Sequence, residues 1–194
     1  PARGDLEYEE LMAKLTENVM HTVLPGLELG GVSTAVKKIV APDGTSKPIA
    51  DVKFDLIVAA VNITRPGKTY VYADNVDDKS KIHQMHLADR GNDRKAVGIE
   101  AFEVDNLVPV LEKMLKASAK GKHICVHCAQ GVDRSTSVIV AFLRVKYGVT
   151  TQEALNFIQS RRYIADPMEV YTGKIEEHID ILRAELVDYI EEVP

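Results

Sequence analysis

One short stretch of this chain joins an apolar run directly to a glycine-containing loop and then to a helix pattern. Residues 123–126 are the apolar run, the loop contains Cys128, Gly131 and Arg134, and residues 135–147 repeat apolar side chains at helical spacing. A tight connection from a strand to a helix aims backbone N–H groups and the positive end of the helix dipole at one point, where an anion can bind. The stretch therefore predicts a strand, an anion-binding loop and a helix in direct succession.

The rest of the chain alternates between segments of strand and helix character. Strand patterns lie at residues 27–31, 54–61 and 123–126. Helix patterns lie at residues 102–117, 135–147, 150–161 and 175–190. The third of these opens on a capping box formed by Thr150 and Glu153. Mostly apolar strands suit a sheet covered on both faces, so the pattern predicts an α/β fold with helices packed on a central sheet.

Prolines and turn-forming residues mark the remaining boundaries. Residues 5–23 carry apolar side chains four or five apart and predict an amphipathic N-terminal helix, which the following Pro-Gly pair ends. Residues 41–48 are rich in turn formers and predict a surface loop or hairpin. Pro109 leaves two alternatives for the helix pattern around it: the helix begins near Asn106, or it kinks at the proline.

Composition narrows the classes of protein and partner. The chain has 194 residues, 45% of them hydrophobic, which is enough for a single domain with its own core. Its net charge is −5 and its Lys and Arg residues are scattered, so we expect no nucleic-acid partner. No apolar stretch is long enough for a membrane span and no N-terminal signal pattern is present, so we expect a cytoplasmic location. The oligomeric state stays open.

Cys125 and Cys128 are the two cysteines of the chain. Three positions apart in a strand, their Cα atoms lie too far from each other for a disulfide bond, so both are expected to be free thiols in a reducing compartment. Cys125 is either a small apolar residue of the strand or a redox partner of Cys128.

The loop after this strand has the composition of a phosphate-binding nest. The backbone N–H groups that can surround the phosphate belong to Ala129, Gln130, Gly131, Val132, Asp133 and Arg134. Gly131 lets the loop turn tightly, because it tolerates backbone angles closed to other residues. The Arg134 guanidinium can bind two phosphate oxygens in a fork.

Cys128 stands at the mouth of this loop and is the candidate nucleophile. A thiolate that faces a helix N-terminus and a nearby cation has a lowered pKa, and it is both a nucleophile and a good leaving group. The Ser135 hydroxyl is placed to hydrogen-bond the sulfur and help it leave, while His127 is expected to order the loop. These residue types at this spacing predict catalysis through a cysteinyl-phosphate intermediate.

The sequence Val-His-Cys-x-x-Gly-x-x-Arg-Ser, at residues 126–135, resembles the signature of the cysteine-dependent protein tyrosine phosphatase superfamily, specifically its dual-specificity branch. Weaker matches lie at residues 24–30, 54–62, 86–89 and 153–161. The resemblance implies the cysteine-phosphatase fold, with a central, mostly parallel sheet flanked by helices. It also implies hydrolysis of phosphomonoesters without a metal ion or other cofactor.

The same resemblance supplies a candidate general acid. Residues 86–89 resemble the loop that carries this acid in the family, which gives the role to Asp89. Asp93 is the alternative, because spacing alone does not choose between the two. His83 and His86 have no cysteine or further histidine beside them, so they are expected to be surface or half-buried histidines rather than metal ligands.

The resemblance also divides the chain. Residues 1–23 are expected to form an N-terminal helix extension, residues 24–168 the catalytic domain, and residues 169–194 a C-terminal helix that packs on the same domain. Arg161 and Arg162 fall at a helix end, where they either complete the helix dipole or recognise an acidic substrate.

Three departures from the family pattern bear on the substrate. The loop at residues 37–53 is long, Asp166-Pro167 replaces the usual Pro-Asn, and Asp133 precedes Arg134 where serine is common. An acidic residue before this arginine is similar to myotubularin-like lipid phosphatases, although a polyphosphorylated inositol requires more positive charge than this loop carries.

The leading hypothesis is a dual-specificity phosphatase that acts on phosphotyrosine and on phosphoserine or phosphothreonine, with a phosphorylated protein or a small phosphoester as its partner. Two alternatives stay open. One is a phosphoinositide or other non-protein phosphatase. The other is a pseudophosphatase, which would bind a phosphorylated partner without turnover.

Overall fold

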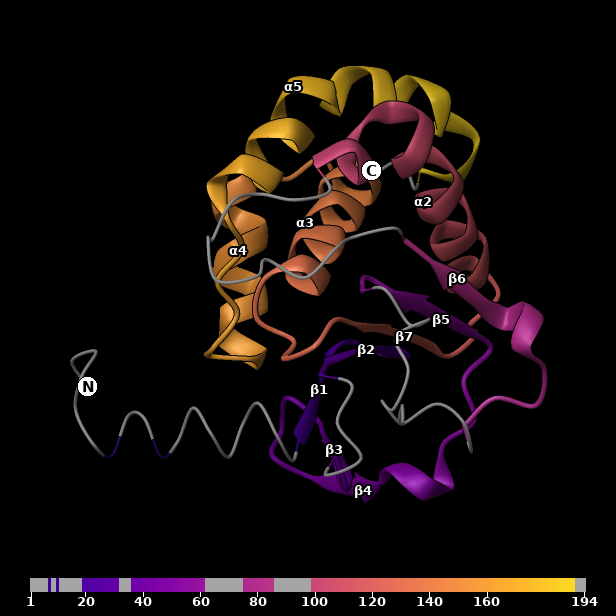
Figure 1. Ribbon diagram of the computed structural model, residues 1–194, viewed down its shortest axis with the longest axis vertical. Helices are drawn as coiled ribbons and strands as arrows, with labels where there is room; N and C mark the ends of the chain where they lie inside the picture. Colours follow the sequence, from indigo (N-terminus) through magenta and orange to yellow (C-terminus); the bar gives the residue numbers. More distant parts are fainter. Residues whose placement is uncertain are drawn as a thin grey trace.

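The computed structural model describes residues 19–31, 36–61, 75–85 and 99–190, together with Glu7 and Glu10, and these residues build one sheet with helices packed on it (Figure 1). The strands are β1 (Val19–Leu24), β2 (Leu27–Gly30), β3 (Lys38–Val40), β4 (Ser46–Pro48), β5 (Leu56–Ala59), β6 (Ile82–Gln84) and β7 (Ile124–His127). The helices are α2 (Val104–Ala119), α3 (Arg134–Tyr147), α4 (Thr151–Arg161) and α5 (Glu169–Glu185). Short 3-10 turns are η1 (Ile49–Asp51), η3 (Lys79–Lys81), η5 (Ile99–Phe102) and η6 (Val187–Tyr189).

The strands of the described part follow the order β4-β3-β1-β2-β7-β5-β6. Four of their six neighbouring pairs are parallel, and the pairs β1–β2 and β3–β4 are antiparallel. β7 lies inside the sheet, with Ile124 paired to Leu27 of β2 on one side and to Leu56 of β5 on the other. The predicted α/β class with a mostly parallel sheet is confirmed, and an interior strand leads to Cys128.

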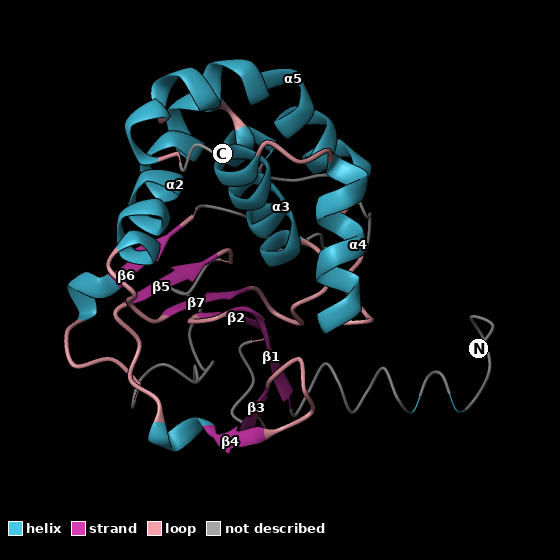
Figure 2. Ribbon diagram, turned by 180° about the vertical axis from the view of Figure 1, so that it is seen from behind, coloured by secondary structure: helices cyan, strands magenta, loops and turns pink. Residues whose placement is uncertain are grey.

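The helices α2 to α5 lie on one face of the sheet, as the two opposite views show (Figures 1 and 2). The larger cluster of buried side chains fills the space between them and the strands, and includes Leu29, Val126, Leu111, Val138 and Ile175. A smaller cluster lies on the opposite face and includes Met20, Ile39, Phe54, Ile57 and Cys125. Side chains from residues 49–54, rather than from an α-helix, cover that face within the described part.

Alternation along β7 separates the two cysteines. The neighbours of Cys125 in the strand face the helices, whereas Cys125 itself joins the smaller cluster, with its Sγ 3.8 Å from Met20 Sδ. Burial, and then the negative charge of Glu28, raises the pKa of the Cys125 thiol. Both cysteines are free and buried. Cys125 is therefore a small apolar strand residue, and the hypothesis of a redox partner for Cys128 gains no support.

Residues 19–23 form most of β1, so the predicted helix over residues 5–23 is wrong at its C-terminal end. β1 pairs with β2 on one side and β3 on the other. These tertiary partners override a local apolar spacing that fits a helix. The Pro-Gly pair, expected to end a helix, turns the chain between β1 and β2. Residues 1–18 lie outside the described part apart from Glu7 and Glu10, which are helical, and the expected boundary after residue 23 falls inside β1.

The turn-rich segment at residues 41–48 forms a hairpin, which is one of the two predicted alternatives. β3 and β4 pair antiparallel, and the Ala41 N–H donates to the Thr45 carbonyl at 2.8 Å. Asp43 Oδ1 accepts from the backbone N–H and the hydroxyl of Thr45, at 3.0 and 2.6 Å. The long loop at residues 37–53 therefore contributes β3 and β4, the two strands at one outer edge of the sheet.

The helix ends follow local sequence signals. Glu153 N–H donates to Thr150 Oγ1 at 3.1 Å and Thr150 N–H to Glu153 Oε1 at 3.0 Å, which confirms the capping box of α4. α2 begins at Val104, so it starts before Asn106 and contains Pro109. None of the helices in the described part is long and apolar enough to cross a membrane.

Asn75 ties down the segment that covers the smaller cluster. Its buried Nδ2 donates to the carbonyls of Ile49 and Val52, both at 2.7 Å. The backbone carbonyl of Asn75 accepts the Phe54 N–H at 2.8 Å. We predict that Asn75→Ala lowers the free energy of unfolding by about 2 kcal/mol, because buried carbonyls lose their donor. Urea denaturation measures this change.

Asn106 offers a matched control for Asn75. Its Nδ2 also donates to a backbone carbonyl, that of Glu100 at 2.6 Å, but at an exposed position. Water can replace this donor, so Asn106→Ala should cost less than about 1 kcal/mol. Equal losses in the two variants would show that the Asn75 contacts do not anchor residues 49–54.

Candidate active site

The candidate site lies where β7 passes into α3, in residues 128–134, here called the Cys-Arg loop. Cys128 follows the last residue of β7 and Arg134 is the first residue of α3, so the predicted succession of strand, loop and helix is confirmed. The Cys128 side chain is 3% exposed. Its Sγ lies 3.0 Å from Ser135 Oγ and accepts the Gly131 N–H at 3.2 Å. The loop thus brings three of the predicted site residues together around one sulfur.

The surroundings of Cys128 favour its thiolate. Burial opposes ionisation, but the charge of Arg134 and the hydrogen bonds from Ser135 and from the Gly131 N–H outweigh it, so the pKa of the Cys128 thiol falls below its ordinary value. Cys125 provides a contrast, because the same burial without those donors raises its pKa. The loop, and not the strand, therefore activates the sulfur.

His127 lies beside the sulfur in the chain but is suited to a structural role. Its ring is buried, with Nδ1 3.4 Å from the Cys128 carbonyl oxygen. Burial lowers the pKa of His127 to about 4, with a smaller contribution from the charge of Arg134, against the opposing hydrogen bond to Cys128. His127 is consequently neutral near pH 7, and its role in ordering the loop stays a prediction.

Two features of the backbone at Gly131 exclude a side chain there. Its φ angle is +69°, in the left-handed region that other residues rarely adopt. A Cβ at this position would also lie 2.5 Å from the carbonyl carbon of Gly30, at the end of β2. The turn and the close approach of two backbones therefore both require glycine, as the sequence predicts for the turn.

The carbonyl groups of the Cys-Arg loop have donors outside the loop. Arg162 Nη2 donates to the Gln130 carbonyl at 3.0 Å and Arg162 Nε to the Gly131 carbonyl at 2.8 Å. The Asp166 N–H donates to the Val132 carbonyl at 2.8 Å. Because C=O and N–H point in opposite directions across a trans peptide, bonds on the carbonyl side leave the N–H groups directed to the other side, where that of Gly131 reaches Cys128 Sγ.

Arg162 is the residue of this site that the sequence analysis missed. It was expected at a helix end, either completing the dipole of α4 or recognising an acidic substrate, but its side chain is fully buried against the loop. Local sequence carries no signal for this role, because the carbonyls it binds lie 31 and 32 residues earlier in the chain.

Asp133 connects the loop to α5. Its Oδ1 accepts the N–H of Met168 at 2.6 Å, and Met168 is the N-cap of α5. Two departures from the family pattern, Asp133 and the Asp166-Pro167 pair, thus lie in two segments that are joined by hydrogen bonds. The carboxylate of Asp133 has a structural partner in the described part of the chain.

Asp89 and Asp93 lie outside the described residues, as does His86. The chain enters that segment from Met85, whose N–H donates to the Ala59 carbonyl at 2.9 Å at the end of β5. Ala59 is paired with His127 of β7 and with Gln84 of β6. Met85 therefore follows β6 at the same ends of the strands where Cys128 follows β7.

Among the described residues, no group of three or more His, Cys, Asp or Glu side chains lies close enough together to hold a metal ion. His83 has Lys113 Nζ at 3.0 Å from its Nδ1. The positive charge of Lys113 at this distance repels a metal cation from the His83 ring.

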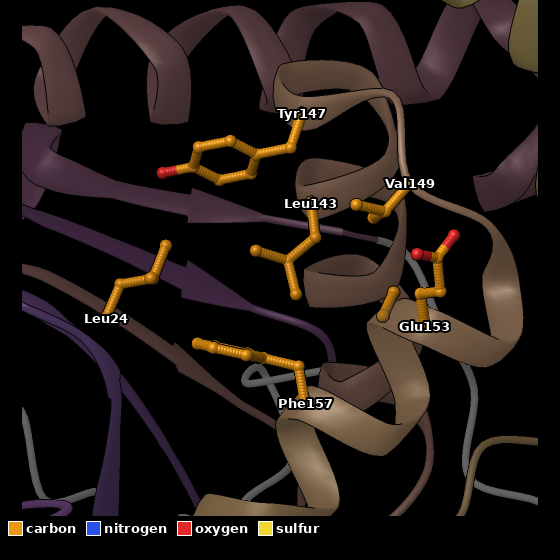
Figure 3. A pocket seen from close by; sticks show the side chains of 7 residues that line it. Leu24, Leu143, Tyr147, Val149, Glu153 and Phe157 are labelled. Atoms are coloured by element: carbon orange, nitrogen blue, oxygen red, sulfur yellow. The ribbon is translucent and has the colours of Figure 1, made fainter. Parts of the chain in front are cut away.

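An apolar pocket of about 470 Å³ lies elsewhere, between β1, α3 and α4 (Figure 3). It is lined by Leu24, Leu143, Tyr147, Val149, Glu153, Ala154 and Phe157. Leu24 pairs with Leu27 and Leu27 with Ile124, at the end of the sheet opposite His127 and Cys128. Glu153 already takes part in the capping box, and the pocket lies away from Cys128, so it is not the candidate active site.

A family model for "Dual specificity phosphatase, catalytic domain" matches residues 40–180, so this chain belongs to the dual specificity phosphatase family. Among curated proteins, Dual specificity protein phosphatase 1 of Arabidopsis thaliana is 28% identical over 126 residues, which cover 62% of each chain. The chain spans less than two thirds of the length of the first curated relatives that it matches.

Solved structures support the same fold. The crystal structure of DUSP15 has a TM-score of 0.62 at 21% identity, covering 91% of this chain and 99% of that one. The crystal structure of PTPMT1 in complex with PI(5)P has a TM-score of 0.59 at 18% identity, covering 85% and 97%. At this identity the likeness establishes the cysteine-phosphatase fold.

Gly131→Ala tests whether the loop depends on the approach to Gly30. We predict a loss of inorganic phosphate binding and a drop in unfolding free energy of roughly 2–4 kcal/mol, since strain and overlap with the Gly30 backbone add together. Isothermal titration with phosphate and urea denaturation measure the two effects.

Gly44→Ala is the control for backbone strain alone. Its φ is +85°, but a Cβ there has no atom within 4 Å. This variant should lose on the order of 1 kcal/mol and bind phosphate normally. If both variants lose the same stability and Gly131→Ala still binds phosphate, the contact with Gly30 does not shape the loop.

Proposed function

We propose that this protein is a cysteine-dependent phosphatase that hydrolyses phosphotyrosine and phosphoserine or phosphothreonine monoesters through a cysteinyl-phosphate intermediate. The observation that carries the proposal is the pair of donors at Cys128 Sγ, the Ser135 hydroxyl and the Gly131 N–H, in a loop that ends on Arg134. Membership of the dual specificity phosphatase family supports the same function.

In the first step the Cys128 thiolate attacks phosphorus and the bond to the leaving oxygen breaks. The Arg134 guanidinium and the backbone N–H groups of residues 129–134 bind the remaining phosphoryl oxygens as their charge grows. The carboxyl group of Asp89 gives its proton to the leaving oxygen, which departs as an alcohol or phenol. The product of this step is a phosphoryl group bonded to sulfur.

In the second step water attacks the same phosphorus and the sulfur–phosphorus bond breaks. The Asp89 carboxylate takes a proton from the water, so inorganic phosphate forms and the acid is restored. The Ser135 hydroxyl, 3.0 Å from Sγ, donates a hydrogen bond to the departing thiolate. Low thiolate basicity assists this step, because a weaker base is a better leaving group.

The side chains of the loop favour a monophosphate on a protein over a polyphosphorylated lipid. Residues 129–133 are Ala, Gln, Gly, Val and Asp, so they add one carboxylate and no cation to Arg134. Several phosphates on one inositol ring require more positive charge than that. A turnover panel of phosphotyrosine peptide, phosphothreonine peptide and phosphoinositide, run with and without EDTA, tests the assignment.

Cys128→Ser should leave less than a few per cent of turnover on the preferred substrate of this panel, because a hydroxyl is a far weaker nucleophile at neutral pH than a thiolate. Inorganic phosphate should still bind, since the loop N–H groups and Arg134 remain. Substantial turnover in the variant would contradict the mechanism. Phosphate binding by a wild-type protein that has no turnover would instead identify a pseudophosphatase.

Asp89→Asn should slow hydrolysis of a phosphothreonine peptide by about 10²- to 10⁴-fold, the usual contribution of a positioned acid. The loss should be much smaller on an aryl phosphate with an electron-poor leaving group, because such an oxygen departs without a proton. Asp93→Asn is the matched control, with the same change of charge four residues away. A leaving-group-dependent loss in Asp93→Asn alone would transfer the role to Asp93.

A further inference from the structure

We propose that Arg162 is a positioning residue for Cys128: through the Gln130–Gly131 peptide, its buried guanidinium holds the N–H group that donates to the sulfur. This inference rests on the proposed function, in which Cys128 is the nucleophile. Sequence patterns place Arg162 after a helix end, and nothing in them links it to the reacting sulfur.

One peptide unit connects the two residues. Arg162 Nη2 donates to the Gln130 carbonyl at 3.0 Å, and the Gly131 N–H of the same peptide donates to Cys128 Sγ at 3.2 Å. C=O and N–H point in opposite directions across a trans peptide, so a donor on the oxygen fixes the direction of the N–H. A cationic donor also polarises the peptide and strengthens the hydrogen bond at its other end.

A second bond holds the next peptide unit, Gly131–Val132. Arg162 Nε donates to the Gly131 carbonyl at 2.8 Å, so two adjacent carbonyls are held by two nitrogens of one planar group. Lysine could not reproduce this arrangement, because its ammonium is a single point of charge on a flexible stem.

The far side of the guanidinium is fixed by β1. Arg162 Nη1 donates to the Val19 carbonyl at 2.9 Å and lies 2.8 Å from His21 Nδ1. Burial, and then the charge of Arg162, lowers the pKa of His21 to about 4, so near pH 7 its ring is neutral and Nδ1 can accept. Arg162 thus connects the first strand of the sheet to the loop.

Arg162 keeps its charge in this environment. Burial lowers the pKa of Arg162 to about 10, while the charge of Cys128 opposes that change. Arg162 is therefore charged near pH 7, and a negative charge on Cys128 favours that charged form. Titratable and charged groups around Cys128 in the described part include Arg134 on α3, His127 at the end of β7, Asp133 in the Cys-Arg loop and Arg162 after α4.

Arg161 differs from its neighbour and provides the control. Its guanidinium lies 4.1 Å from the centre of the Phe157 ring, and its Nη1 donates to Ser160 Oγ at 2.7 Å. Both contacts stay within α4. The interpretation as a helix-end residue therefore fits Arg161 and not Arg162.

The test measures the thiolate pKa of Cys128 in the full chain from the pH dependence of its alkylation by iodoacetamide, with fragmentation of the peptide in the mass spectrometer to separate Cys128 from Cys125. Arg162→Met should raise this pKa by about one unit, so that alkylation near pH 6 slows by about tenfold. It should also lower kcat by roughly tenfold or more with a smaller change in KM. Arg161→Met should change none of these values.

Arg162→Lys keeps the charge and loses the fork, so it should raise the thiolate pKa by less than Arg162→Met does. It decides the question if the methionine variant does not fold. A folded Arg162 variant with the wild-type thiolate pKa and kcat, even one with a lower melting temperature, would overturn the proposal and leave Arg162 a purely structural residue. Alkylation needs no turnover, so a wild-type protein without phosphatase activity would refute the proposed function while this measurement still decides the inference.

Discussion

A loop that directs its N–H groups at an anion must satisfy its carbonyl groups on the other side, and this requirement organises the molecule around the Cys-Arg loop. The carbonyls of residues 130–132 are bound by Arg162 and by the Asp166 N–H, while that of Asp133 accepts the Ser137 N–H within α3. Without these donors, several buried peptide oxygens would be unpaired, at a cost of about 1–3 kcal/mol each. The shape of the proposed anion site thus depends on residues outside the Cys-Arg loop.

The same requirement explains why distant segments belong to one unit. The connection between α4 and α5 reaches the loop from one side, through Arg162 and Asp166, and Asp133 returns a bond to Met168. β1 supports Arg162 from behind through the Val19 carbonyl. The departures from the family pattern at Asp133 and Asp166 therefore lie in the two segments that these hydrogen bonds join, the Cys-Arg loop and the connection between α4 and α5.

Sequence predicts the parts of this arrangement that depend on neighbours in the chain. The strand, the glycine turn and the start of α3 all lie within residues 124–135, and the positions of Cys128, Gly131, Arg134 and Ser135 agree with the prediction. The capping box of α4 is equally local. Prediction fails where partners are remote: residues 19–23 join a sheet, although their spacing fits a helix, and Arg162 binds Val19 across 143 residues. The general acid stays a proposal, because Asp89 and Asp93 lie outside the described residues.

The central claim is that Cys128 itself carries the phosphoryl group between substrate and water. Acid quenching of the enzyme during turnover of a ³²P-labelled phosphotyrosine peptide, followed by peptide mapping, tests it most directly. A cysteinyl-phosphate intermediate predicts a labelled peptide that contains Cys128, with an acid-stable bond that iodine cleaves, as expected for phosphorus on sulfur. Rapid turnover with no label on the protein, or with label on a histidine, serine or aspartate, would contradict it.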